Sequence, residues 1–146
     1  MGQRKYTFDA EMQLKDAGLV GSTAAATVGG GAKVIDLGTA RFEGVAIIDV
    51  TAIEIASNDE LYDIVLEVSS SATFASDIEQ AAHLQLGATE VRDGGAIDSP
   101  VGRYELMFCN EQADTVRRYL RARTVVSGTV ATGINYSAWV APLPGK

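Results

Sequence analysis

The sequence predicts an all-β protein built as an antiparallel β-sandwich. Short segments of alternating apolar and polar residues follow one another from Gly44 to Val140, and turn residues separate them. No helical spacing of apolar residues intervenes, which excludes a doubly wound α/β fold. The 15 glycines suit a chain with many turns. A jelly roll is one of the few ways to arrange about seven such strands.

Residues 1–32 differ from the rest of the chain and predict an extended N-terminal arm. Their helical spacing is weak, and three consecutive glycines, Gly29, Gly30 and Gly31, follow it. Because such a run is unfavourable in a regular element, it indicates a flexible turn or hinge. The expected organisation is therefore an arm with a glycine hinge at 1–32 and a jelly-roll sandwich domain at 33–146.

The sandwich domain begins with two predicted strands. Residues 33–38 form a short apolar segment that ends at a glycine. Residues 45–55 are rich in β-branched side chains and only partly alternating, which is typical of a strand covered on both faces for part of its length. The polar run at 57–60 then predicts a turn.

Residues 61–68 have the clearest alternation among the early segments. Asp63 and Glu67 are expected to face solvent. The side chains expected in the core are Tyr62, Ile64, Leu66 and Val68. A polar loop follows at 69–77, and one aromatic residue, Phe74, would anchor it.

The next part of the chain predicts a strand, a loop and another strand. Residues 78–90 lead into a strand, and residues 92–100 contain two glycines and a proline that indicate a loop. Residues 103–108 alternate again. The side chains expected on one face of this last segment are Tyr104, Leu106 and Phe108.

Two further strands complete the predicted sandwich. Residues 116–126 form a long segment whose polar face must be exposed or paired with acids. The side chains on that face, here termed the arginine row, are Arg117, Tyr119, Arg121 and Arg123. Residues 134–140 form the last strand, and the proline-bearing tail after it cannot extend the ladder.

Size and composition indicate one domain with its own core. A domain of 146 residues buries roughly 68–70% of the surface that its unfolded chain exposes. The single cysteine, Cys109, lies in an apolar run and is interpreted as a buried thiol. No segment has the ~18 consecutive apolar residues of a membrane span, and no signal-peptide pattern opens the chain. We therefore expect a soluble protein made in the cytosol, without membrane contact.

Charge argues against nucleic-acid binding and divides the chain into two parts. A net charge of -7 opposes the phosphate neutralisation on which such binding depends. Residues 42–91 contain ten acidic side chains and no Lys or Arg, whereas five arginines fall between Arg103 and Arg123. The acidic and basic regions could pair within one subunit, between subunits, or with a partner.

No residue set supports catalysis or metal binding. His83 is the only histidine and lies in a predicted strand without a nucleophile pattern nearby, so it is interpreted as structural. One histidine and one cysteine are too few ligands for zinc, and the acidic residues lack calcium-loop spacing. Paired carboxylates such as Asp59 and Glu60 suit a turn better than a glycosidase site. We expect no enzymatic activity and no cofactor.

Three parts of the sequence resemble the jelly-roll capsid cement (decoration) proteins of tailed bacteriophages. They are residues 34–38, residues 61–74, and a C-terminal set at 102–106, 118–121, 128–129 and 133–134. The resemblance covers roughly Val34 to Val140 and consists of the strand pattern and a few framework residues. It implies a β jelly roll and a homotrimer on the outer surface of the virion capsid, at three-fold and quasi-three-fold positions, where it clamps neighbouring major capsid subunits.

Given this resemblance, we expect two contact regions. The arm would reach a neighbouring cement or capsid subunit, and the arginine row would meet acidic residues at a subunit interface. The arm residues expected to make contact are Arg4, Lys5, Tyr6 and Phe8. The expected partners are the major capsid protein and further copies of the chain, with neither nucleic acid nor membrane.

The alternative is a β-sandwich carbohydrate- or receptor-binding module of a phage tail. A sugar platform usually needs exposed aromatic side chains. The candidates are Tyr119, Tyr136 and Trp139, each of which also fits the core.

Overall fold

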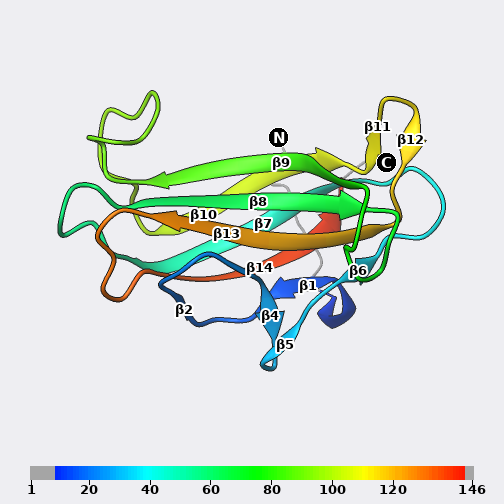
Figure 1. Cartoon of the computed structure of the whole chain (residues 1–146), viewed down its shortest axis with the longest axis horizontal. Helices are drawn as coiled ribbons and strands as arrows, with labels where there is room; N and C mark the ends of the chain where they lie inside the picture. The colour runs from blue at the N-terminus through cyan, green and yellow to red at the C-terminus, as the bar shows by residue number, and fades with distance from the viewer. Residues whose placement is uncertain (1–8, 144–146) are drawn as a thin grey trace, which may run out of the picture.

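A computed structural model describes residues 9–143 as two antiparallel sheets packed face to face (Figure 1). The strand order in sheet A is β1 (Gln13–Lys15), β14 (Ile134–Pro142), β7 (Glu43–Ile53) and β10 (Gly102–Cys109), and β2 (Leu19–Val20) also pairs with β14. The order in sheet B is β3 (Ala24–Ala25), β13 (Tyr119–Ser127), β8 (Leu61–Ser69) and β9 (Ile78–Gly87), and β6 (Ile35–Asp36) also pairs with β13. The predicted all-β antiparallel sandwich is confirmed.

Short elements complete the described part of the chain. A 3-10 helix, η1 (Ala10–Met12), precedes β1, and two small hairpins join β4 (Thr27–Val28) to β5 (Gly31–Ala32) and β11 (Glu111–Gln112) to β12 (Thr115–Val116). Within residues 9–143 there is no helix long and apolar enough to cross a membrane.

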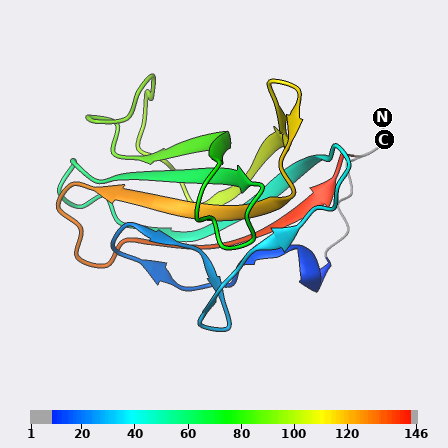
Figure 2. The same ribbon diagram turned by 45° about the vertical axis from the view of Figure 1, so that its right-hand side comes forward.

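The long strands alternate between the two layers (Figure 2). The chain passes from sheet A to sheet B between β7 and β8, returns between β9 and β10, and crosses twice more around β13. Among the long strands, only β8 and β9 are consecutive partners in one sheet. This crossing pattern is compatible with a jelly roll.

One predicted strand is interrupted. The segment 116–126 was expected to be continuous, but β12 ends at Val116 and β13 begins at Tyr119. The cause is a local alternative set of hydrogen bonds: Arg117 N donates to Asn110 O (3.0 Å), and Asn110 Nδ2 donates to Arg117 O (2.9 Å). Arg117 is therefore displaced from the ladder that holds the other members of the arginine row.

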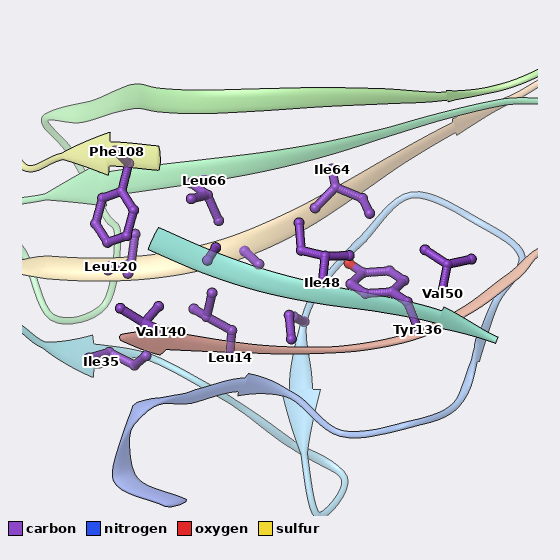
Figure 3. Close-up of a cluster of buried hydrophobic side chains, with 14 of the residues drawn as sticks. Leu14, Ile35, Ile48, Val50, Ile64, Leu66, Phe108, Leu120, Tyr136 and Val140 are labelled. Carbon is purple, nitrogen blue, oxygen red and sulfur yellow. The ribbon is translucent and has the colours of Figure 1, made fainter. Parts of the chain in front are cut away.

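The core lies between the sheets and confirms the alternation expected for β8 (Figure 3). The four predicted core side chains of this strand are fully buried: Tyr62, Ile64, Leu66 and Val68. They pack against side chains of sheet A such as Ile48 and Tyr136. Each fully buried aliphatic side chain stabilises the fold by about 1.5–3 kcal/mol relative to an exposed one.

Strand β7 is buried on both faces, as its partial alternation predicted. Ala46, Ile48 and Val50 belong to the core between the sheets. A second cluster lies on the other face of sheet A and consists of Val45, Ile47, Trp139 and Ala141, with Leu143 packed against it. The first half of β7 is therefore a continuous buried run, whereas Thr51 and Ala52 are exposed.

The expectation of a separate arm at 1–32 is wrong for residues 13–26, whose short strands β1, β2 and β3 pair with the long strands of the sandwich. Leu14 is fully buried in the main core. Lys15 is also buried, and its Nζ donates to three backbone carbonyls, including Tyr136 O at 2.7 Å. Gly29 and Gly30, with φ of 61° and 82°, form the turn of the β4–β5 hairpin and not a hinge between separate bodies.

Sequence reasoning missed this integration because β1 to β5 are only two or three residues long. Such strands are too short to show alternation. Burial of Leu14 and the three hydrogen bonds of Lys15 hold them in place instead.

Candidate interaction surfaces

Two of the four members of the arginine row, Arg117 and Arg121, fix a loop of the same chain. This loop, residues 70–77, joins β8 to β9 and is termed the Phe74 loop. Arg117 is buried, and its Nε and Nη2 both donate to Asp77 Oδ1, at 3.1 and 3.0 Å. This contact lowers the pKa of the Asp77 carboxyl. The base-free acidic segment thus supplies the counter-ion for an arginine forty residues later.

Arg121 holds the centre of the same loop. Its Nε donates to Glu67 Oε1 on the neighbouring strand at 2.9 Å, and its guanidinium carbon lies 4.4 Å from the centroid of the Phe74 ring. Phe74 is only 6% exposed, although its backbone has a φ of 53° that non-glycine residues rarely adopt. The expected aromatic anchor of the loop is therefore confirmed, and Arg121 is the residue that covers it.

The other two members of the row differ from each other. Tyr119 is half-buried, and the guanidinium of Arg118 lies over its ring while binding Asp36 through two hydrogen bonds of 2.7 and 2.8 Å. This pairing lowers the pKa of Asp36 to about 2. Arg123 is half-buried and has no ion-pair partner among residues 9–143.

Of the possibilities for the charged regions, pairing within one subunit is present at several sites. The pairs that join the two regions are Arg103 with Asp49, Arg117 with Asp77, and Arg121 with Glu67, whereas Arg118 pairs with Asp36, which precedes the acidic region. The subunit interface through the arginine row stays a prediction, with Arg123 as its unpaired member in the described range. The predicted arm contacts, Arg4, Lys5, Tyr6 and Phe8, lie outside the described residues.

A second loop is also held by an arginine. The sequence predicted the position of this loop but not the contacts that hold it. Residues 88–101 join β9 to β10 and form the Arg92 loop, so the loop expected at 92–100 is confirmed. Arg92 Nη1 donates to Ser99 Oγ and Nη2 donates to Ile97 O, both at 2.9 Å. The guanidinium lies so close to Gly95 that a Cβ there would come within 2.3 Å of Arg92 Nε. Glycine at this position therefore makes room for the brace.

Further hydrogen bonds close the Arg92 loop at its base and along its length. Ser99 N donates to Gly87 O, and Gly87 N donates to Ser99 Oγ, each at 3.0 Å. Thr89 N donates to Asp98 Oδ1 at 2.8 Å, and Thr89 Oγ1 donates to Gly95 O at 3.1 Å. The loop is consequently held by its own residues in one shape.

This loop also carries much of the exposed apolar surface. Six large hydrophobic side chains are exposed in the described range: Leu19, Ile78, Val91, Ile97, Val101 and Met107. Three of them, Val91, Ile97 and Val101, belong to the Arg92 loop, and Ile97 is 65% exposed. Figure 1 shows the loop standing away from both sheets at one end of the sandwich. The sequence signal was the presence of three aliphatic residues, Val91, Ile97 and Val101, in and beside a loop with two glycines and a proline.

A cluster of loops near β14 is fixed by carboxylates. Glu54 accepts hydrogen bonds from the backbone N–H groups of Ala131, Thr132 and Gly133 at 2.8–3.1 Å. Asp59 accepts from Thr129 N and Oγ1 at 3.0 and 2.8 Å. These donors lower the pKa of both carboxyls. Glu54 and Asp59 therefore hold the loop at 129–133 through hydrogen bonds within the chain.

The described residues hold no group of three or more His, Cys, Asp or Glu side chains suited to a metal ion. His83 binds Asp63 at 2.7 Å on the outer face of sheet B, where β9 and β8 pair. A hollow of about 360 Å³ lies beside Lys15. Its one ammonium group is already bound to three carbonyls, which leaves the hollow without a free charged donor.

The three aromatic side chains named as candidates for a sugar platform are buried or partly covered. Tyr136 is fully buried and donates or accepts a hydrogen bond with Thr124 Oγ1, and burial raises its pKa to about 12. Trp139 is buried in the cluster on the outer side of β7. Tyr119, half-buried under Arg118, is the most accessible of the three.

Comparison with known proteins gives no family for the chain. No protein-family model matches it, and no similar curated protein was found. The function must therefore be inferred from the surfaces described above and from the resemblance of the sequence to phage cement proteins.

Proposed function

We propose that the protein is a structural virion protein that binds the outer surface of a phage head as a cement protein, stabilising the capsid by clamping adjacent major capsid subunits. The observation that carries the proposal is the division of roles between charged and apolar side chains. Arginines and carboxylates link loops to strands within the chain, while three of the six exposed large apolar side chains of the described range lie on the braced Arg92 loop. Such a body is suited to presenting a rigid surface to another protein.

Binding as a clamp depends on rigidity and on multiple contacts. A pre-ordered loop loses little conformational entropy when it binds, so more of the contact energy remains as affinity. A trimer makes three contacts at once, and such multivalency raises the effective affinity by about 10²–10⁴ over a single contact. The predicted homotrimer would therefore hold a capsid lattice through individually modest interfaces.

Co-sedimentation with phage heads tests this proposal. Heads are assembled from the major capsid protein encoded in the same genome, mixed with the purified protein, and pelleted. Saturable binding, together with an increase in the temperature at which heads release their contents, is the expected result. Absence of binding to mature heads would contradict the proposal, as would binding to an array of glycans with no affinity for heads.

The oligomeric state provides a second test. Light scattering on the purified protein should give a mass three times that of the 15.4 kDa chain. A monomer that stays monomeric when bound to heads would remove the trimeric clamp from the proposal.

A further inference from the structure

The Arg92 loop has the features of a docking element. Its apolar side chains point to a protein partner, because Val91, Ile97 and Val101 are all exposed on this one loop. Its brace fixes them before binding, through Arg92 on Ser99 and Ile97. A flexible linker between β9 and β10 would need neither feature.

The charges around these apolar side chains have one sign. Glu90, Asp93 and Asp98 are exposed in the loop. Its one basic side chain, Arg92, is turned inward and bound to Ser99 and Ile97. The loop therefore presents apolar groups within an acidic rim. A complementary surface is an apolar pocket edged by lysine or arginine.

A second copy of this chain is a poor candidate for the protein that carries this basic-rimmed pocket. Most of its arginines already have acidic partners of their own: Arg41, Arg103, Arg117, Arg118 and Arg121. The chain also carries a net charge of -7, so a second copy has the same overall sign of charge as this rim. Charge complementarity favours a different protein.

We propose that the Arg92 loop docks into an apolar pocket with a basic rim on the capsid surface; this inference rests on the function proposed above. Ile97 is the central apolar contact, and Asp93 is an acidic contact at the rim. Arg92 and Gly95 act as positioning residues that keep the loop in its binding shape.

Substitution at the loop tip tests the apolar contact. Ile97→Asp should lower the affinity for heads at least about tenfold, as expected for a central apolar contact. Leu19→Asp is the matched control, since Leu19 is 58% exposed and lies on β2, beside β14 and away from β10. It should bind like the unmodified protein. Far-UV circular dichroism verifies that both variants are folded.

Substitution at the rim tests the charge. Asp93→Lys should weaken binding to heads and reduce the dependence of binding on salt. Glu11→Lys is the matched control, because it changes the net charge by the same amount at an exposed site outside the loop, and it should have neither effect. Gly95→Ala keeps the proposed contact side chains, Asp93 and Ile97, but its Cβ displaces the Arg92 guanidinium that holds the loop. This variant should therefore also weaken binding.

The outcomes separate the two proposals. If the unmodified protein does not bind heads, the cement function fails and the docking inference falls with it. If it binds and Ile97→Asp binds equally well, only the docking inference is overturned. If Ile97→Asp alters the oligomeric state while head binding is unchanged, the loop contacts another copy of the chain, which also overturns the inference.

Discussion

Two loops of this protein are held by arginine side chains, but to opposite effect. In the Phe74 loop the arginines, Arg117 and Arg121, belong to the body of the sandwich, and they bind the loop from outside. In the Arg92 loop the arginine belongs to the loop itself and binds other residues of that loop. The first arrangement buries an apolar side chain, Phe74, and the second leaves one, Ile97, exposed.

The comparison shows that a guanidinium group can serve two different purposes with the same donors. Its planar array of five N–H groups can fasten a loop to a sheet or make a loop rigid by itself. Only the second use leaves the apolar side chains of the loop available to a partner. In this protein, the loop whose apolar side chain is covered is held by arginines from outside it, and the loop whose apolar side chains are exposed is held by its own arginine.

The largest expected difference between the loops lies in the contribution of their apolar residues to stability. Phe74→Ala should lower the free energy of unfolding by about 3 kcal/mol, because a buried aromatic ring is lost and a cavity remains beneath Arg121. Ile97→Ala should change it by less than about 0.5 kcal/mol. Urea denaturation measures both values. Equal losses for the two variants would refute the distinction between covering and presenting loops.

The next effect concerns the arginine that covers Phe74. Arg121→Met keeps an aliphatic side chain over the ring but removes the contact with Glu67, and it should lower the free energy of unfolding by about 1–2 kcal/mol. Glu67→Gln and the double variant complete a double-mutant cycle. A coupling energy near zero between positions 67 and 121 would show that the pair contributes nothing to the anchoring of the loop.

A smaller effect is expected from acid. Arg117 lowers the pKa of Asp77 in the folded state, so this carboxylate contributes stability that is fully present above its unfolded-state pKa of about 3.9. That contribution is lost as the pH falls below this value and through the lower folded-state pKa. Asp77→Asn should therefore flatten the decline of stability below about pH 4.

Asp93→Asn in the Arg92 loop is the matched control, because the Asp93 carboxylate has no arginine partner in the described structure. Thermal unfolding of both variants at several pH values makes the comparison. If the stability of Asp77→Asn declined with falling pH as steeply as that of the unmodified protein, the result would contradict a stabilising role for the Arg117 contact.

The smallest effect on global stability should come from the brace itself. Gly95→Ala should change the midpoint of thermal unfolding little, since the residues around it are exposed, but it should speed amide exchange at 93–98 by about tenfold or more through local opening. Gly94→Ala is not a suitable control because Gly94 has a φ of 69°, so Ala96→Gly serves instead. Unchanged exchange in Gly95→Ala would mean that Arg92 does not hold the loop.

The long strands were predictable because each is long enough to show its burial in its sequence. The alternation from Tyr62 to Val68 and the continuous run in the first half of β7 both correspond to the observed burial. The anchoring role of Phe74 could be predicted as well, because phenylalanine is among the side chains most often buried.

The remaining features depend on contacts between residues distant in the sequence. Leu14 joins the core and Lys15 binds Tyr136, 121 residues later, so no local pattern could show that this segment belongs to the sandwich. The arginine row looked like a free surface because its partners, Glu67 and Asp77, are 54 and 40 residues away. The brace of Arg92 was equally invisible, since it is formed by a side chain, a backbone carbonyl and the space left by a glycine.

Hydrogen–deuterium exchange on the protein alone and bound to heads tests the central claim most directly. A cement protein that docks through the Arg92 loop should gain protection at residues 93–98 on binding, while the Phe74 loop, already covered by Arg121, should show no change. Protection confined to residues 70–77, or none at 93–98 in a protein that is bound to heads, would contradict the account.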